Sequence, residues 1–307
     1  MLSVLICTYN REKYIGPLLE SIAANDLAKS EYEIVVVDNN CTDNTRGVCE
    51  AFAEAHKDVQ FNYCVETEQG LSAARNKAIK EARGDILVYV DDDALVDIWY
   101  LRTIAQYMST HPEISAVGGP IIPFYETTEP KWMTRFTKEL LCGYLYFGDK
   151  ERPFPGERYP GGGNAAYRAI VFQKVGLFNT ALGRKGNNLM GAEEKDIFDK
   201  MKSQGMRFMY LPNMILHHII PQKKLERDYF DRLTYQIGVS ERQRTLAIST
   251  NKYIKRLFFE LCKWCATIIL LVCYTLLCSP NKGWKLVLFR RNVTRGLFSM
   301  ASDPVHN

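Results

Sequence analysis

Apolar residues in the first half of the chain form short runs that alternate with longer amphipathic stretches. The short runs, rich in valine and isoleucine, predict strands over residues 2–7, 33–37, 59–64 and 86–90. Apolar positions three or four residues apart predict helices over residues 11–24, 42–55, 72–82 and 99–109, the first with Asn10 as its N-cap. This alternation predicts an α/β fold: a doubly wound, mostly parallel sheet with helices on both faces.

Polar residues follow three of the predicted strands at the point where each strand ends. They are Thr8, Tyr9 and Asn10 after the first strand, Asp38, Asn39 and Asn40 after the second, and Asp91, Asp92 and Asp93 after the fourth. Ligands of doubly wound sheets bind beyond the carboxyl ends of the strands. We therefore expect these residues to meet at one edge of the sheet and to form a binding site.

The three consecutive aspartates are the most informative of these clusters. Adjacent carboxylates repel one another unless a cation lies beside them. Carboxylate oxygens suit Mg²⁺ or Mn²⁺, which usually arrive with substrate phosphates. The cluster therefore predicts a site for a divalent metal and a phosphorylated ligand, with an exposed acidic turn as the alternative.

Arg75 lies one turn into a predicted helix that opens with Gly70, Leu71 and Ser72. Its side chain can reach a phosphate or cross the sheet edge to the acids; an ordinary surface arginine is the alternative. The chain lacks GxGxxG after its first strand and lacks the P-loop pattern GxxxxGK(S/T). These absences argue against a dinucleotide-binding Rossmann domain and against a P-loop ATPase.

Residues 121–160 interrupt the alternation and are rich in proline and aromatic residues. Long irregular segments in compact domains are usually functional or mobile, and the aromatic side chains here either stack on a sugar ring or cover the sheet. The segment leads into Gly161, Gly162, Gly163 and Asn164. Such a glycine run allows the backbone to approach a ligand closely, or simply makes a tight turn.

A second acidic cluster, Glu193, Glu194 and Asp196, falls in the first turn of another predicted helix. The helix dipole stabilises acids at this position, and one of them can instead serve as a general base. Residues 207–211 and 214–216 predict two short strands, the second ending in His217 and His218. Tandem histidines at a strand end are candidate metal ligands.

The chain changes character near residue 225, so we divide it into residues 1–225 and 226–307. Residues 226–244 predict a charged helix, and residues 254–278 are strongly apolar, although only 264–278 carry no charge. This uncharged run is shorter than the roughly 20 residues of a spanning helix, and lysine and arginine flank it. The pattern favours amphipathic helices in a membrane interface; a packed helix and a true span are the alternatives.

Composition adds three constraints. The 307 residues are 47% hydrophobic and 24% charged, which are globular values. A net charge of +4 gives no support to nucleic-acid binding. The N-terminus lacks the features of a cleaved secretion signal, so we expect the nine cysteines to be reduced thiols.

The motifs occur in a fixed order: Thr8-Tyr9-Asn10-Arg11, Asp38-Asn39-Asn40, Gly70-Leu71-Ser72-Ala73-Ala74-Arg75-Asn76, Asp91-Asp92-Asp93, Gly162-Gly163-Asn164 and Glu193-Glu194-Lys195-Asp196. Over residues 1–225 this set resembles the family 2 glycosyltransferases, which have a GT-A fold, and among them the enzymes of bacterial cell-surface polysaccharides. The resemblance implies an inverting, metal-dependent transferase. It would move a sugar from a nucleoside-diphosphate sugar, a UDP-sugar by default, to a hydroxyl of a glycan or lipid-linked acceptor.

The resemblance also implies roles for individual residues. The nucleotide and donor side would comprise Thr8, Tyr9, Asn10, Arg11, Asp38, Arg75, Asn76, Asp91 and Asp92, with Arg75 and Asn76 over the diphosphate. Asp93 and His218, rather than His217, would hold Mg²⁺ or Mn²⁺. The acceptor side would comprise Gly162, Gly163, Asn164 and Glu193. Glu194 would be the catalytic base, with Asp196 as the second candidate.

Such an enzyme would be cytoplasmic and peripheral on the inner face of the cell membrane, held there by its C-terminal helices. Two other functions are alternatives. One is a sugar nucleotidyltransferase, which releases pyrophosphate, and the other is a non-catalytic nucleotide-sugar binding protein at the membrane.

Overall fold

The computed structural model describes residues 1–185 and 193–299, and the chain forms two compact units. The sheet unit comprises residues 1–124 and 143–219, and the helical unit comprises residues 125–142 and 220–307. The units therefore divide a few residues before position 225, and part of the irregular segment belongs to the helical unit.

The sheet unit is built on an eight-stranded sheet in the order β3-β2-β1-β4-β9-β6-β10-β8. Its strands are β1 (Leu2–Thr8), β2 (Tyr32–Asp38), β3 (Gln60–Val65), β4 (Ile86–Val90), β6 (Ile114–Gly118), β8 (Arg152–Pro153), β9 (Asn164–Arg168) and β10 (Arg207–Tyr210). The first four strands of the chain are parallel, and β10 is parallel to β6. The sheet is thus mostly parallel, as the sequence predicts, but β9 runs antiparallel between β4 and β6.

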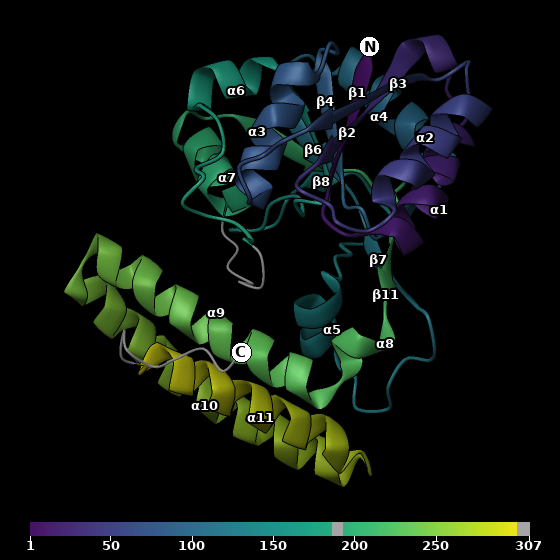
Figure 1. The fold of residues 1–307 in the computed structure, drawn as a ribbon. Helices are drawn as coiled ribbons and strands as arrows, with labels where there is room; N and C mark the ends of the chain where they lie inside the picture. The colour runs from purple at the N-terminus through teal and green to yellow at the C-terminus, as the bar shows by residue number, and fades with distance from the viewer. Residues whose placement is uncertain (186–192, 300–307) are drawn as a thin grey trace. The chain divides into compact units, whose positions relative to one another are not determined.

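Helices cover both faces of this sheet (Figure 1). They are α1 (Glu12–Ala23), α2 (Thr45–Ala55) and α4 (Tyr100–Thr110) on one face, and α3 (Leu71–Glu81), α6 (Ile170–Val175) and α7 (Glu193–Ser203) on the other. Alternate residues of β1 serve the two faces: Val4 and Ile6 pack in the first core, and Leu5 packs in the second. Strands buried on both faces must be apolar throughout, which explains the uninterrupted runs in the sequence.

A second, three-stranded sheet has the order β5-β11-β7, with β5 (Ala94–Val96), β11 (Leu216–Ile220) and β7 (Ile121–Tyr125). The prediction that His217 and His218 follow a strand over 214–216 is wrong. Both histidines lie inside β11, where His217 pairs with Leu95 and His218 with Ala94. Successive strand residues point to opposite faces, so the two imidazoles face opposite sides of the small sheet.

The helical unit contains α5 (Arg135–Cys142), α8 (Gln222–Leu225), α9 (Arg227–Ile248), α10 (Thr250–Leu276) and α11 (Pro280–Leu297). The three long helices α9, α10 and α11 lie side by side (Figure 1). Helices α9 and α11 touch backbone to backbone, since a Cβ added at Gly238 would lie 2.1 Å from the carbonyl oxygen of Val293. The helix α11 was not predicted from the sequence.

The predicted helix N-cap at Asn10 is also wrong. The first helix begins at Glu12, with Arg11 at the N-cap position, and Asn10 adopts a left-handed backbone conformation with φ of 55°. Its side-chain oxygen accepts a hydrogen bond from the backbone N–H of Thr42 (2.7 Å) instead. Asn10 therefore joins the turns that follow β1 and β2, a long-range contact that a local capping rule does not contain.

Candidate active site

The polar ends of β1 and β2 lie side by side, because Thr8 pairs in register with Asp38. Both residues are buried. The carboxylate of Asp38 accepts hydrogen bonds from the backbone N–H of Cys41 (2.6 Å) and from the hydroxyl of Tyr63. Asp38 is therefore anchored at the sheet edge, where the sequence predicts it.

Asn39 ties the next loop to the same edge. Its amide nitrogen donates to the carbonyl oxygens of Glu66 (2.9 Å) and Glu68 (2.8 Å), and its amide oxygen accepts from the backbone N–H of Gly70 (2.8 Å). These three bonds place the start of α3 beside the ends of β1 and β2. The sequence marked Asn39 as polar but gave no signal for this role.

The three aspartates after β4 have different partners. Asp92 accepts a hydrogen bond from Nε of Arg11 (3.1 Å), while Asp93 lies 3.7 Å from Nη2 of Arg11 and 3.2 Å from Nε2 of His218. Burial raises the pKa of Asp92 to about 6; Arg11 opposes this rise, whereas Asp93 and Asp91 add to it. Asp93 is buried, Asp92 is partly buried and Asp91 is exposed, so the cluster passes from the surface into the protein and pairs with cations through Asp92 and Asp93.

Asp93 and His218 present a carboxylate oxygen and an imidazole nitrogen to one point. A cation such as Mn²⁺ accepts both kinds of ligand. Within residues 1–185 and 193–299, no group of three or more His, Cys, Asp or Glu side chains is arranged to hold a metal ion. A metal on this pair would take its remaining ligands from phosphate oxygens or water, which is usual for Mg²⁺.

The second acidic cluster, at the start of α7, pairs with Arg75 of α3. Nη1 of Arg75 lies 3.1 Å from Oε1 of Glu193, and Nη2 lies 2.9 Å from Oε1 of Glu194. The guanidinium group packs over the rings of Tyr89 and Phe178, at 5.6 and 5.3 Å from their centroids. The side chains of Arg75 and Glu193 are each 3% exposed, whereas that of Glu194 is 23% exposed.

The two glutamates differ in their acidity. Burial, reinforced by repulsion from Glu194, raises the pKa of Glu193 to about 7 despite the attraction of Arg75. Burial would raise the pKa of Glu194 as well, but Arg75 outweighs it and holds that pKa below its ordinary value. Glu194 is therefore ionised at neutral pH, whereas Glu193 keeps its proton to a higher pH than Glu194 does.

Two adjacent glycines bring the acidic clusters together. A Cβ at Gly162 would lie 1.7 Å from Oε1 of Glu194, and a Cβ at Gly163 would lie 2.1 Å from the carboxylate carbon of Asp91. Only residues without a side chain allow both acids to come this close. The antiparallel pairing of β9 with β4, which puts Asn164 opposite Val90, delivers these glycines to the end of β4.

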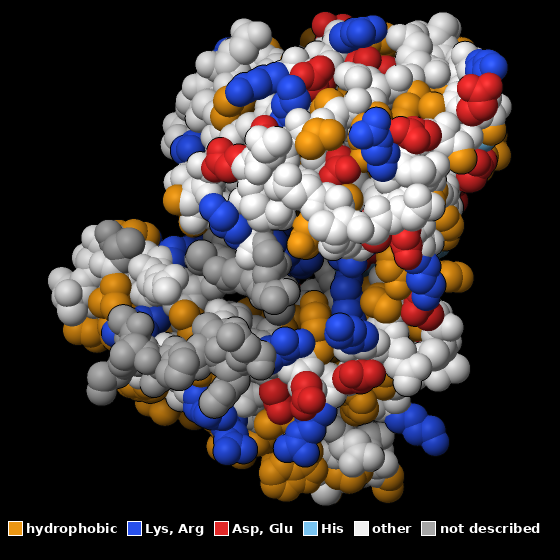
Figure 2. Space-filling view, viewed as in Figure 1, with side chains coloured by type: hydrophobic (Ala, Val, Ile, Leu, Met, Phe, Trp, Pro, Cys, Tyr) orange, Lys and Arg blue, Asp and Glu red, His pale blue; other side chains and the backbone are white. Residues whose placement is uncertain are grey.

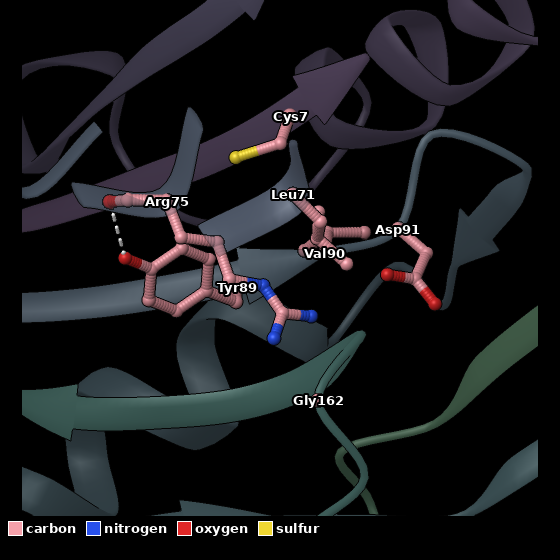
Figure 3. A pocket seen from close by; sticks show the side chains of 7 residues that line it. All are labelled: Cys7, Leu71, Arg75, Tyr89, Val90, Asp91 and Gly162. Atoms are coloured by element: carbon pink, nitrogen blue, oxygen red, sulfur yellow. Dashed lines mark hydrogen bonds between the residues drawn. The ribbon is translucent and has the colours of Figure 1, made fainter. Parts of the chain in front are cut away.

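A small pocket lies beside Arg75, Asp91 and Gly162 (Figure 3). It is lined by Cys7, Leu71, Arg75, Tyr89, Val90, Asp91 and Gly162. The guanidinium group of Arg75 and the carboxylate of Asp91 reach toward Gly162 from α3 and from the end of β4 (Figure 3). Burial raises the pKa of Cys7 to about 12, so its thiol is neutral and does not act as a nucleophile.

Three residues predicted for the site make contacts of a different kind. The side chain of Asn164 is fully buried and bonds to the hydroxyl of Tyr100 (2.8 Å) and to the carbonyl oxygen of Pro120 (2.8 Å). The amide of Asn76 bonds to the backbone of Phe178. Asp196 lies 2.7 Å from Lys200 on its own helix.

Comparison with known proteins identifies the family and the fold. The sequence profile described as glycosyl transferase family 2 matches residues 3–176. The chain belongs to glycosyl transferase family 2. Family 2 membership and the architecture together establish a glycosyltransferase with a GT-A fold, as the sequence predicts.

Two relatives of this family 2 member are informative. The glucosyl-dolichyl phosphate glucuronosyltransferase of Haloferax volcanii is 28% identical over 268 residues, which cover 83% of this chain and 82% of the relative. The poly(ribitol-phosphate) β-N-acetylglucosaminyltransferase TarS of Staphylococcus aureus is 35% identical over 137 residues, which cover 42% of this chain but only 24% of TarS.

Two solved structures share the fold. A mannosyltransferase from Pyrobaculum calidifontis, in complex with GDP-Man and Mn²⁺, has a TM-score of 0.64 at 20% identity and covers 97% of this chain and 87% of that chain. Residues 1–349 of TarS, in complex with UDP, have a TM-score of 0.53 at 21% identity and cover 77% of this chain and 65% of that one.

Proposed function

We propose that this glycosyltransferase is inverting and metal-dependent, with Glu194 as its catalytic base. The observation that carries the proposal is the meeting of two acidic clusters on Gly162 and Gly163. One cluster is suited to bind a cation and a diphosphate. The other contains an ionised carboxylate that is partly open to solvent.

The donor nucleotide is assigned to the sheet edge. Thr8 through Arg11 and Asp38 bind the base and ribose, and Asp91 and Asp92 face the ribose or the sugar. Asp38 and Asp92 are held by hydrogen bonds from Tyr63 and Arg11, which supports a preformed site. UDP remains the default nucleotide, although the solved neighbours include complexes with UDP and with GDP-Man.

Asp93 and His218 are the residues that would hold Mg²⁺ or Mn²⁺. When bound there, the cation would stabilise the negative charge that develops on the leaving nucleoside diphosphate. The 3.2 Å approach of the two side chains supports this assignment. Solved neighbours that contain Mn²⁺ support a divalent metal in this fold, without identifying its ligands here.

Glu194 takes the proton of the acceptor hydroxyl, and the oxygen forms a bond to the anomeric carbon. The bond from that carbon to the phosphate oxygen breaks on the opposite face, so one displacement inverts the configuration. Asp196 is a weaker candidate, because Lys200 pairs with it. The remaining residues of the acceptor side are Gly162, Gly163 and Glu193, with Asn164 as their support.

The helical unit supports attachment to a membrane. The described part of the chain contains one helix, Thr250–Leu276, that is long and apolar enough to cross a membrane, with a mean hydropathy of 1.8 in its best window. Its exposed side chains include Phe258, Phe259, Ile268, Ile269, Val272 and Leu276. Along the lower edge of Figure 2, apolar and basic side chains dominate the surface of this unit.

The charges of α10 and α11 favour a helix in the plane of the interface. Glu260 is the one acid between residues 250 and 297, and it is buried against Arg256 (2.8 Å) and Arg290 (3.0 Å). The exposed surface of these helices therefore offers basic and apolar groups to an anionic membrane. We assign the enzyme to the inner face of the cell membrane, where a lipid-linked acceptor would be within reach.

Native cysteines can test this attachment. Cys262, Cys265, Cys273 and Cys278 are exposed along α10 and at its end, whereas Cys49 and Cys142 are buried. Sealed inverted vesicles expose the cytoplasmic face of the membrane to added maleimide. If the helix lies in the plane of the interface, none of the four thiols lies on the lumenal side, so none reacts from inside the vesicle. A Cys278 that reacts only from the opposite side would show a span, and the two buried thiols serve as internal controls.

A panel of nucleotide sugars tests the activity itself. We expect one donor to give metal-dependent release of a nucleoside diphosphate that increases with a glycan or lipid-linked acceptor. Release of pyrophosphate would indicate a nucleotidyltransferase, and binding without any release would indicate a non-catalytic protein. Neither alternative requires the paired glutamates of α7.

A further inference from the structure

Arg75 lies at the centre of the candidate site, yet its contacts do not leave it available as a phosphate ligand. Its two Nη atoms pair with two different carboxylates, those of Glu193 and Glu194. Only 3% of its side chain is exposed. Reaching a diphosphate would require breaking both ion pairs and leaving two buried carboxylates without their cation, which is strongly unfavourable.

The surroundings of Arg75 fix its orientation further. The guanidinium group packs against the rings of Tyr89 and Phe178, which also contact each other, and the hydroxyl of Tyr89 donates a hydrogen bond to the backbone carbonyl of Arg75 (2.9 Å). Asn76, the next residue of α3, holds Phe178 in place with two hydrogen bonds to its backbone, each of 2.9 Å. The guanidinium group is therefore held in place by neighbours on β4, on α3 and in the segment after α6.

We propose that Arg75 is a positioning residue, whose guanidinium group holds Glu193 and Glu194 together so that Glu194 faces the acceptor hydroxyl as the ionised member of the pair. This inference rests on the proposed function, because it presumes that Glu194 is the base. It replaces the diphosphate role that family resemblance assigns to Arg75.

The net charge of Glu193, Glu194 and Arg75 fits this role. Two ionised carboxylates beside one guanidinium carry a net charge of −1 in a buried place, and a proton on one of them removes that charge. The two side chains also share a hydrogen bond, which raises the pKa of Glu193 and lowers that of Glu194, so Glu193 is the member that holds the proton. Glu194, the more exposed member, then keeps its lone pairs for the acceptor.

Other ionisable groups around the pair come from several elements. They are Asp91 after β4, Cys7 on β1, Tyr89 on β4, Tyr159 before β9 and Tyr167 on β9. Burial raises the pKa of Cys7, Tyr159 and Tyr167 far above 7, so all three stay neutral near physiological pH. Within the described residues, Arg75 is therefore the cation that governs the acidity of Glu194.

Substitution of Arg75 separates a positioning role from a phosphate-binding role. In Arg75→Met, we expect kcat to fall by about 100-fold, the scale of general-base catalysis, while the Kd for the nucleoside diphosphate changes less than twofold. The acidic limb of the kcat–pH profile should move to higher pH, because Glu194 loses the cation that lowers its pKa. Arg75→Lys should restore part of kcat, since one ammonium cannot pair with both carboxylates in the same geometry.

The control is Arg46→Met, which removes an exposed arginine of α2 that pairs with Glu50 and should leave kcat, Kd and the pH profile unchanged. An Arg75→Met enzyme with a tenfold weaker nucleotide Kd, an unaltered kcat at saturating donor and an unmoved acidic limb would overturn the proposal. Arg75 would then be a diphosphate ligand.

A second variant keeps the test valid if Arg75→Met does not fold. Glu193→Gln mimics the protonated carboxyl, so the acidic limb should move to lower pH because Glu194 loses a negative neighbour. Carbon-13 NMR titration of the glutamate carboxyls in wild type and Glu193→Gln needs no substrate and follows the same shift. A Glu194 titration that is unchanged in this variant contradicts the positioning role of Arg75. A wild type without turnover contradicts only the proposed function.

Discussion

The two acidic clusters of this enzyme are neutralised in different ways. Asp92 and Asp93 pair with Arg11 and His218, whose side chains are 32% and 14% exposed, so a cation or a ligand can compete for them. Glu193 and Glu194 pair with Arg75, which is almost completely buried and fixed by aromatic rings. Under the proposed function, the first cluster would exchange its partners during binding, and the second would keep its partner during the reaction.

The largest expected effect comes from the fixed cluster. Glu194→Gln removes the base without changing the size of the side chain, so kcat should fall by about 1000-fold. Nucleotide binding, measured by calorimetry, should remain within a factor of two. The matched variant Asp196→Asn should retain turnover; if Asp196→Asn is inactive and Glu194→Gln is active, the base is misassigned.

Loss of an acid from the Asp92–Asp93 cluster should instead weaken nucleotide binding. Asp93→Ala removes one of the two assigned cation ligands, and we expect nucleotide affinity in the presence of Mn²⁺ to fall by about 10- to 100-fold, as for loss of a metal-site partner. Chelator should weaken the wild type to a similar degree and have little further effect on the variant. Equal affinity in all four measurements would remove the metal from the account.

The side chain of Asn164 contacts neither cluster and bonds instead to Tyr100, Pro120 and Met214. Asn164→Ala leaves the hydroxyl of Tyr100 and the carbonyl oxygens of Pro120 and Met214 without their buried partner. We expect the free energy of unfolding to fall by about 2 kcal/mol, measured by urea denaturation. An unchanged stability combined with a raised acceptor KM would instead give Asn164 the direct acceptor contact that family resemblance implies.

The smallest expected effects compare the two glycines. Gly162→Ala pushes against Glu194 and should lower kcat about tenfold, whereas Gly163→Ala pushes against Asp91 and should raise the donor KM about tenfold, because a misplacement near 1 Å is costly in either step. Steady-state kinetics with varied donor separate the two. The same change in both variants would mean that the loop moves as one body.

Much of the fold follows from the sequence because its signals are local. The runs of β1, β2 and β4 are apolar throughout since both faces of the sheet are covered, and the polar residues at their ends lie at one edge, as predicted. The antiparallel insertion of β9 has no such signal. Its position decides that Gly162 and Gly163 meet Asp91 and Glu194, so the contact between the clusters could not be predicted.

The candidate site shows the same division between local and long-range information. The order of motifs led to the prediction of Asp93, Glu194 and Arg75 as site residues, and the family resemblance added His218; their roles stay predictions. The partner of Arg75 was not predicted, because a distance of 118 residues along the chain separates it from Glu193. Likewise, Asn10 looks like a helix cap in the sequence, and only the contact with Thr42 shows that it joins two turns.

The stereochemistry of the product tests the central claim most directly. We propose one displacement, with Glu194 on the face opposite the leaving diphosphate. Proton NMR of the first product should therefore show an anomeric configuration opposite to that of the donor sugar. A product that retains the donor configuration would require two displacements or a different attacking group, and would contradict the assignment of Glu194 as the base.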